Sequence, residues 1–582
     1  MMRCRVSGAV LAASLAALAA CAAVPTARPV DPAVDAQPGP TVELDASPYG
    51  LFLAGSAARD EGEFDAAASY LAKASADEGE PTFLKADAFH AALESGDIVA
   101  AVSLAPSGPD VAPGDLHLAA LAHGVESLAE GKYKEAYAAL IGPDQGFPYK
   151  PAAALLAPFA ALAAGDDTDA VARPEVGSDS VAQLVGDLDQ TGIYERLGRF
   201  KDAEAGYKAL SRTGGAGGII AAKYGAFLER RHRTADAVAV YKAALAQAPD
   251  DVVLGAALIR AQNHARPPPI GDVRQSASEA LVIPGASLVA RKQLELALID
   301  LRLALRLDPA NDEAWMLVGD ILSLRDMEAA RAAYERVGVA SPRYVTARDK
   351  LAYSYERTGE PAEALKIARD TAVAAPASRD ALVTLANVLR DNGQYAESAA
   401  VLTKLIDAGS AHPDWRLYYL RASAYDETGD REKTQADLSV ALRLNPDEPD
   451  LLNFQGYFWI ERGEHLDEAL VMVQRAVDAE PQSGPMIDSL GWAYYRLGDF
   501  KSAATYLENA VSLDPSVPEV NDHLGDAYWR VGRKTEAVFE WRRVLSLDPA
   551  PKLKAAVIAK LASPLGPDAP VPAAPPATTQ AP

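Results

Sequence analysis

The chain has 582 residues, a formal net charge of −24 at pH 7 and a hydrophobic content of 49%. Such a negative chain is a poor partner for nucleic acid, because phosphate groups need a positive surface. After the first 20 residues no second long apolar run occurs, which excludes a polytopic membrane protein. No strand-like alternation of β-branched residues extends far enough to suggest a sheet, so we expect an all-α fold.

Residues 1–20 have the pattern of a secretion signal. Two arginines precede an apolar stretch that ends at Ala20 and is too short for a comfortable membrane span. Its end, LAAC with Cys21 last, resembles the lipobox of bacterial lipoproteins. The resemblance implies cleavage before Cys21, a diacylglyceryl group on its sulfur and an acyl chain on its amine. The alternative is an ordinary signal peptide cut after Ala20, which leaves Cys21 as a free thiol.

The residue after Cys21 is alanine rather than aspartate, and by resemblance to sorting signals of enteric bacteria this favours the outer membrane. We therefore expect a lipid-anchored chain at the bacterial outer membrane that faces the periplasm. The other cysteine, Cys4, leaves with the signal, so no intrachain disulfide, Cys-based metal site or Cys nucleophile is expected. A Pro-rich tether at 21–48 and a tail at 563–582 are expected to lack a fold.

Between these ends a period of about 34 residues organises the chain. Turn glycines recur at this spacing from Gly62 to Gly198 and again from Gly359 to Gly532. The period breaks where three consecutive prolines, 267–269, cannot continue a helix. The pattern predicts a degenerate N-terminal array at 49–262, a Pro-containing join at 263–285 and a C-terminal array at 286–562, with about 14 hairpins in all. The join is either a hinge or a long loop inside one continuous superhelix.

The clearest repeat is the pair of copies in residues 488–543. Gly491 and Gly525 are small residues on the first helix of each copy, and Ala503 and Ala537 are their counterparts on the second. Small side chains let two helices cross closely, and a larger one would over-pack the crossing by roughly 1–3 kcal/mol. This order of residues resembles the tetratricopeptide repeat (TPR). The resemblance implies a right-handed TPR superhelix, an α-solenoid of antiparallel helix pairs.

The residues that usually carry catalysis do not form a convincing site. The eight histidines have no metal-ligand spacing, and the sequence contains no HExxH, P-loop, GxSxG or GxGxxG motif. The glycine-rich segment 214–218 lacks the preceding strand and the following Lys-Ser/Thr of a phosphate-binding loop, so it is interpreted as a turn between hairpins. We therefore expect a protein that is not an enzyme and that needs no metal or cofactor.

A binding surface is the remaining prediction. In TPR arrays the first helix of each hairpin lines a concave groove, and helical spacing puts the groove-facing positions on one face. Aromatic anchors beside charged groups are typical of peptide recognition. The alternative is that Trp492 and Trp529 pack against the next hairpin. In the last three units the predicted groove residues are Asn453, Phe454, Tyr457, Asp488, Trp492, Tyr495, Arg496, Asp522, His523, Asp526, Trp529 and Arg530.

Asp, Ser, His and Arg stand where the family's carboxylate clamp uses Lys and Asn, so capture of a C-terminal carboxylate by that clamp is not expected. The phrases DSLGWAYYRLGDF and NDHLGDAYWRVGRKTEA are similar to the C-terminal units of large TPR lipoproteins of Gram-negative bacteria. That resemblance implies an outer-membrane-tethered adaptor that brings a periplasmic carboxyl-terminal processing protease to substrates such as peptidoglycan cross-link hydrolases. Two rival functions are an assembly or pilot lipoprotein for a secretion or polysaccharide-export machine, and an envelope hydrolase or transferase with an unrecognised site.

Overall fold

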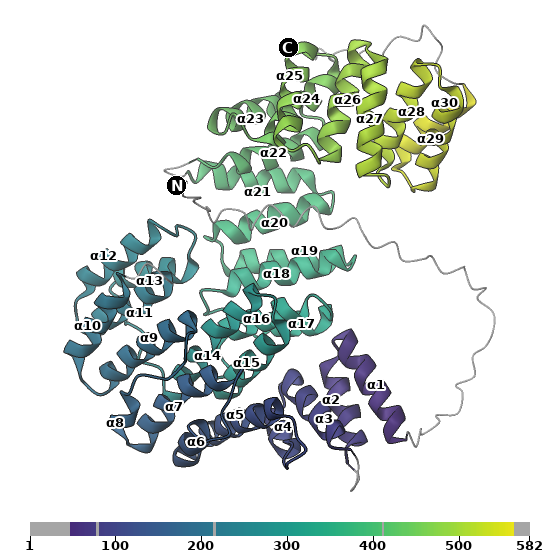
Figure 1. The fold of residues 1–582 in the computed structure, drawn as a ribbon. Coiled ribbons are helices and arrows are strands. Elements are labelled where there is room, and N and C mark those ends of the chain that lie inside the picture. Colours follow the sequence, from purple (N-terminus) through teal and green to yellow (C-terminus); the bar gives the residue numbers. More distant parts are fainter. Residues whose placement is uncertain (1–46, 77–80, 213–216, 410–412, 564–582) are drawn as a thin grey trace, which may run out of the picture.

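A computed structural model describes residues 47–76, 81–212, 217–409 and 413–563, and within these ranges the chain has 30 helices and no strand (Figure 1). The predicted signal peptide, Cys21, nearly all of the tether and nearly all of the tail lie outside the described residues. The helices pair into 14 hairpins, with α13 and α30 as single helices, so the α-solenoid predicted from the 34-residue period is confirmed. No helix in the described ranges is long and apolar enough to cross a membrane.

The first 13 helices form the N-terminal array. Their bounds are α1 Pro48–Glu61, α2 Phe64–Ala74, α3 Thr82–Ser95, α4 Ile98–Leu104, α5 Pro113–Ala129, α6 Tyr133–Leu140, α7 Lys150–Ala164, α8 Asp167–Ala170, α9 Ser180–Arg196, α10 Phe200–Leu210, α11 Gly217–Arg230, α12 Thr234–Leu245 and α13 Val252–Gln262.

The remaining helices form the C-terminal array, which begins with the hairpin α14/α15. Their bounds are α14 Val273–Ala290, α15 Leu294–Leu307, α16 Asp312–Leu322, α17 Met327–Glu335, α18 Tyr344–Arg357, α19 Pro361–Ala374, α20 Arg379–Asp391, α21 Tyr395–Asp407, α22 Trp415–Glu427, α23 Arg431–Leu444, α24 Pro449–Arg462, α25 Leu466–Ala479, α26 Gly484–Leu497, α27 Phe500–Leu513, α28 Pro518–Arg530, α29 Lys534–Ser546 and α30 Pro551–Ala562.

The helix α14 starts inside the segment that the sequence predicts as a join. Its N-cap is Asp272, which accepts a hydrogen bond from the backbone of Gln275, while the Gln275 side chain binds the backbone of Asp272. This capping box begins a helix firmly. Pro284, inside the predicted join, lies within α14 and is accommodated there. The helical part of the C-terminal array thus begins at Val273, ahead of the predicted boundary at 286, and the prolines at 267–269 stay in the connection before it.

The predicted close crossing of the two helices is present in the clearest repeats. A Cβ atom on Gly525 would lie 2.6 Å from the Trp541 ring and 3.3 Å from the carbonyl oxygen of Ala537. A Cβ atom on Gly491 would lie 2.7 Å from Leu507 Cγ. The Leu507 and Trp541 side chains are fully buried. Each glycine therefore makes room for a large side chain of the second helix.

Replacing Gly525 by alanine is expected to destabilise the C-terminal hairpins by about 2 kcal/mol, because the Trp541 ring and a backbone carbonyl leave no room for a methyl group. Chemical unfolding followed by tryptophan fluorescence measures this. The control is Gly192→Ala in α9, where a Cβ meets no atom within 4 Å. Alanine there is expected to stabilise its helix by up to about 1 kcal/mol. Equal effects of the two substitutions would show that the crossing is not tightly packed.

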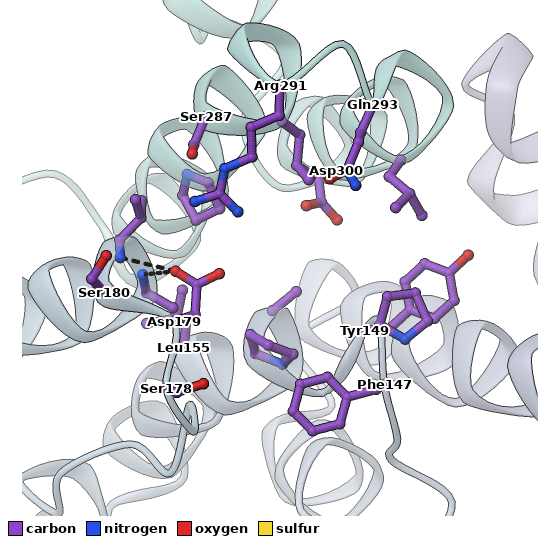
Figure 2. A pocket seen from close by; sticks show the side chains of 18 residues that line it. Phe147, Tyr149, Leu155, Ser178, Asp179, Ser180, Ser287, Arg291, Gln293 and Asp300 are labelled. Carbon is purple, nitrogen blue, oxygen red and sulfur yellow. Dashed lines mark hydrogen bonds between the residues drawn. The ribbon is translucent and has the colours of Figure 1, made fainter.

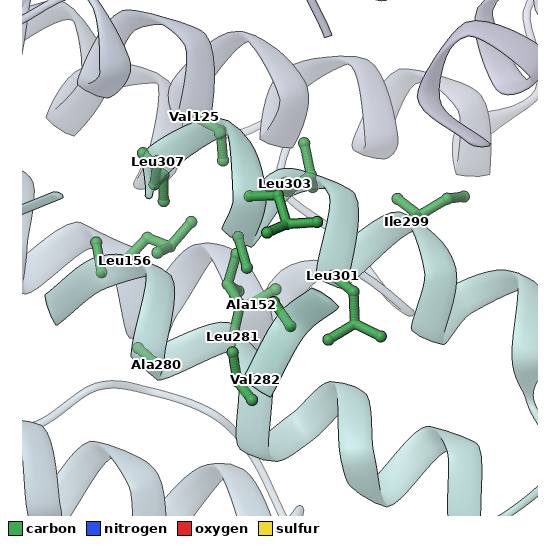
Figure 3. Close-up of a cluster of buried hydrophobic side chains, with 14 of the residues drawn as sticks. Val125, Ala152, Leu156, Ala280, Leu281, Val282, Ile299, Leu301, Leu303 and Leu307 are labelled. Carbon is green, nitrogen blue, oxygen red and sulfur yellow. The ribbon is translucent and has the colours of Figure 1, made fainter. Parts of the chain in front are cut away.

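The hairpin α14/α15 packs sideways against the N-terminal array, which curves around it in Figure 1. α14 contacts α7 and α9, and α15 contacts α3, α4 and α5. The largest hydrophobic cluster joins these elements and includes Leu156 of α7, Leu281 of α14 and Leu303 of α15 (Figure 3). The inner side of the N-terminal array is therefore occupied by a segment of the same chain.

Polar contacts reinforce this internal packing. The Nε and Nη2 atoms of Arg306 donate to the two carboxylate oxygens of Glu126 at 2.7 and 2.8 Å, and Arg302 Nε donates to the backbone carbonyl of Glu94 at 3.0 Å. Glu126 is 8% exposed. Buried charges are stable only when they are paired, so these contacts fix α15 against α3 and α5.

Candidate partner-binding groove

The predicted groove residues lie on the first helices of three consecutive hairpins, α24, α26 and α28. The structure brings the central ones together in a stack. The Trp492 ring stacks on the Tyr495 ring, with 4.5 Å between their centroids. It also stacks on the ring of His523 in the next hairpin, with 4.1 Å between their centroids. Trp492 Nε1 also donates to Glu461 Oε1 of the preceding hairpin at 2.7 Å. Trp492 is only 7% exposed, so it acts as packing between hairpins.

An ion pair supports this stack. His523 Nδ1 lies 3.0 Å from both carboxylate oxygens of Asp488 in α26. Burial by itself lowers the pKa of His523, but the charge of the adjacent Asp488 and its hydrogen bond outweigh burial and raise the pKa to about 9. The imidazole is therefore protonated at neutral pH and donates to Asp488. This pair joins two successive first helices across the predicted groove face.

The acidic residues of the last hairpin are held by the final helix. Lys560 Nζ in α30 donates to both carboxylate oxygens of Asp522 at 2.8 Å and to Asp526 Oδ2 at 2.9 Å. Trp541 Nε1 donates to Asp526 Oδ1 at 3.0 Å. Lys560 is not among the residues predicted from the sequence, although it stands one 34-residue period after Asp526. In this part of the face the predicted binding residues are engaged within the chain.

The accessible part of the predicted face lies nearer to α22 and α24. Asn453, Phe454 and Tyr457 are half-buried, as are Trp529 and Arg530, whereas Tyr495 and Arg496 are buried. The Phe454 ring meets Tyr419 edge-to-face with centroids 5.6 Å apart. Trp415, half-buried like Tyr419, meets that tyrosine edge-to-face at 6.1 Å. We call Trp415, Tyr419 and Phe454 the aromatic row. The sequence analysis missed Tyr419, which precedes Phe454 by one repeat.

Comparisons with known proteins agree with this geometry. Residues 273–549 match the family model described as "Tetratricopeptide repeat". In this region the chain is therefore similar to a tetratricopeptide-repeat array. The TPR repeat-containing protein PA4667 of Pseudomonas aeruginosa is 30% identical over 94 residues, which are 16% of this chain and 16% of that protein. The protein O-mannosyl-transferase TMTC1 of Homo sapiens is 25% identical over 157 residues, which are 26% of this chain and 18% of that protein. The chain thus spans less than a fifth of the length of each of these relatives.

Among solved structures, the APC/C hetero-tetramer Cut9–Hcn1 matches with a TM-score of 0.37. It is 14% identical, and the match covers 88% of this chain and 95% of that one. MamA AMB-1 is 22% identical, with a TM-score of 0.25, over 29% of this chain and 97% of that one.

One acidic position recurs on the first helices of the tetratricopeptide-repeat array. Residues at this position are 35 apart and lie on α18, α20, α22 and α24: Glu356, Asp391, Asp426 and Glu461. Asp426 accepts from Arg462 and Glu461 accepts from Trp492. Glu356 Oε1 has no hydrogen-bond partner among the described residues, and burial, followed by the charge of Asp391, raises the pKa of Glu356 to about 7. Two of these acidic groups, Asp426 and Glu461, share helices α22 and α24 with the aromatic row, a combination suited to a partner with apolar and basic side chains.

Proposed function

We propose that the chain is a non-catalytic scaffold that binds proteins or peptides on the face formed by the aromatic row and Tyr457. Tetratricopeptide repeats typically serve as protein-interaction scaffolds, and the match of residues 273–549 to that family supports this role. The aromatic row carries the proposal. Its rings come from two neighbouring first helices, contact one another and remain half-buried. Rigid aromatic anchors of this kind provide much of the affinity in protein interfaces.

We also propose that the scaffold is anchored by lipid at Cys21 to the bacterial outer membrane and faces the periplasm. The signal-like residues 1–20 and the lipobox-like end at Cys21 support this location. An anchor raises the effective concentration of bound partners near the membrane. In that place the chain would present envelope proteins that remodel peptidoglycan to a protease. The alternative function is an assembly or pilot lipoprotein for an outer-membrane secretion or polysaccharide-export machine.

Capture of partners from an envelope extract tests the groove. A soluble form that begins after Cys21 is expected to retain proteins that the double variant Phe454→Ala/Tyr457→Ala retains at least tenfold less, because truncated anchors cost binding energy. Trp492→Ala is unsuitable for this test, since it would remove a buried stack and weaken the fold.

Phe539→Ala is the matched control, because Phe539 is 63% exposed on α29, the second helix of its hairpin. It is expected to retain the same proteins as the wild type. If the double variant does so too, the proposed face is not the binding site. A captured protease together with its substrates favours the presenting role, and a captured secretion or export component favours the pilot role.

The lipid anchor is tested separately with the variant Cys21→Ser. It is expected to lose both palmitate labelling and association with the membrane.

A further inference from the structure

A cavity of about 490 Å³ lies where the N-terminal array meets the hairpin α14/α15, far from the aromatic row in sequence. It is lined by two separate stretches, residues 147–182 and residues 284–300. Much of its wall is apolar, with Phe147, Pro148 and Leu155 on one side and Leu288 and Leu296 on the other. Figure 2 shows the labelled side chains of both stretches arranged around this space. Its volume is sufficient for a short peptide.

Asp300 is the unusual residue of this cavity. It lies among the buried apolar residues of α15, is 7% exposed and lines the cavity. In Figure 2 its carboxyl group extends toward the space between the two stretches. No hydrogen bond or ion pair to Asp300 is found within the described part of the chain, and burial raises the pKa of Asp300 to about 7. An unpaired buried carboxylate is costly, so a group that enters the cavity and pairs with Asp300 would remove that cost.

A positive group is available on the same side of the cavity. Arg291, the residue that follows α14, is exposed, and its guanidinium has no ion pair or hydrogen bond among the described residues. Tyr149 supplies a polar hydroxyl on the opposite wall. Burial, followed by the charge of Asp300, raises the pKa of Tyr149 to about 12, so the hydroxyl remains a donor at neutral pH. Asp179, the other carboxylate, already accepts from the backbone of Val181 and Ala182.

We propose that this cavity binds a short unprotected peptide whose ammonium group pairs with Asp300 and whose carboxylate pairs with Arg291. The apolar walls would receive a hydrophobic side chain of the peptide. The Asp300 carboxylate and the Arg291 guanidinium on one cavity match the two charges of a zwitterion. Asp300 and the already engaged Asp179 are the only carboxylates among the described lining residues, too few to hold a metal ion. This site is separate from the aromatic row and does not depend on the function proposed for it.

Equilibrium dialysis of the full chain in detergent tests the proposal. The probe is a mixture of unprotected dipeptides that each carry one apolar side chain. The comparison probes are the same dipeptides with an acetylated amine or an amidated carboxylate. Acetylation is expected to lower the affinity at least tenfold, because it removes the charge that pairs with Asp300. Amidation is expected to lower it severalfold through loss of the contact with Arg291.

Variants assign the effect to the two side chains. Asp300→Asn is expected to weaken binding of the unprotected dipeptides at least tenfold, and Arg291→Gln is expected to abolish the preference for a free carboxylate. Asp370→Asn, at an exposed position of α19, is the matched control and is expected to bind like the wild type. Thermal unfolding without ligand is measured alongside, and Asp300→Asn is expected to unfold no earlier than the wild type because it removes a buried charge.

The proposal is wrong if the protein retains no unprotected dipeptide at millimolar concentration, or if it retains acetylated and unprotected dipeptides equally. It is also wrong if Asp300→Asn binds the unprotected dipeptides as tightly as the wild type does. Because the ligand changes do not alter the protein, the comparison of probes remains informative even if a variant folds poorly.

Discussion

The variant Arg306→Ala is expected to lower, by about 3 kcal/mol, the free energy needed to separate α15 from α5 and expose the α5 amides. Arg306 makes two hydrogen bonds to the Glu126 carboxylate, and its removal leaves that buried charge without a partner. We take the lower end of the range for broken buried pairs, because the Arg306 side chain is itself 31% exposed. Native-state hydrogen exchange of the α5 amides measures the effect, which appears as faster exchange in this helix.

Two further variants make this result specific. Arg306→Ala/Glu126→Gln is expected to regain part of the lost stability, since an amide is less costly to bury than an unpaired carboxylate. Arg173→Ala removes an ion pair with Asp187 in which the arginine side chain is 65% exposed. Because exposed ion pairs contribute little, this substitution is expected to lower the stability by less than about 1 kcal/mol. If Arg306→Ala costs no more than Arg173→Ala, the ion pair between Arg306 and Glu126 does not help to hold α15 against α5.

The last hairpins are expected to lose stability as the pH rises from 7 through 9. His523 has a pKa of about 9 in the folded chain, above the ordinary value of 6.5. When folding raises the pKa of a histidine, protonation stabilises the folded chain. This stabilisation is fully present at pH values below the pKa of the unfolded chain, and it is lost as the pH rises through the pKa of the folded chain. The contribution is on the order of 3 kcal/mol. Chemical unfolding followed by tryptophan fluorescence at pH 7 and at pH values around 9 measures it.

Asp488→Asn tests the origin of this pH dependence. Without the Asp488 carboxylate, burial dominates and His523 is expected to be neutral in the folded chain at pH 7. The variant is therefore expected to be less stable than the wild type at pH 7 and to lose little further stability between pH 7 and 9. A wild type and variant with parallel profiles would show that the pair between His523 and Asp488 is not responsible.

The sequence predicted the repeat architecture well because its signals are local. Gly525 and Trp541 lie within one hairpin, so their close contact follows from the 34-residue period alone. The packing of α15 into the N-terminal array was not predicted, because Arg302 and Glu94 are 208 residues apart and no period relates them. One signal was available. Leucine, isoleucine and alanine occupy ten of the 14 positions of Leu294–Leu307, more than one apolar stripe needs, and such a helix is usually covered on more than one face.

The groove prediction placed its residues on the first helices of three consecutive hairpins, where the structure has them, but it did not anticipate how deeply several of their side chains are buried. Counting positions placed Trp492 and His523 on the inner face of their helices, and the structure brings them together. Neighbouring first helices pack so closely that these rings cover each other, which no single repeat reveals. Asp300 was also missed, although a carboxylate within the apolar run LELALIDLRLALRL was a visible signal for a special environment.

The position of α15 has a consequence for the order in which the molecule is built. The ribosome makes α3, α5 and α7 well before α14 and α15, yet their inner sides are covered only when that hairpin is present. Until residue 307 is present, the N-terminal half therefore exposes an apolar surface, and transiently exposed surface of this kind promotes aggregation. Contacts between residues this far apart in the sequence form slowly. The N-terminal half therefore completes its packing late, after the hairpin α14/α15 has been made.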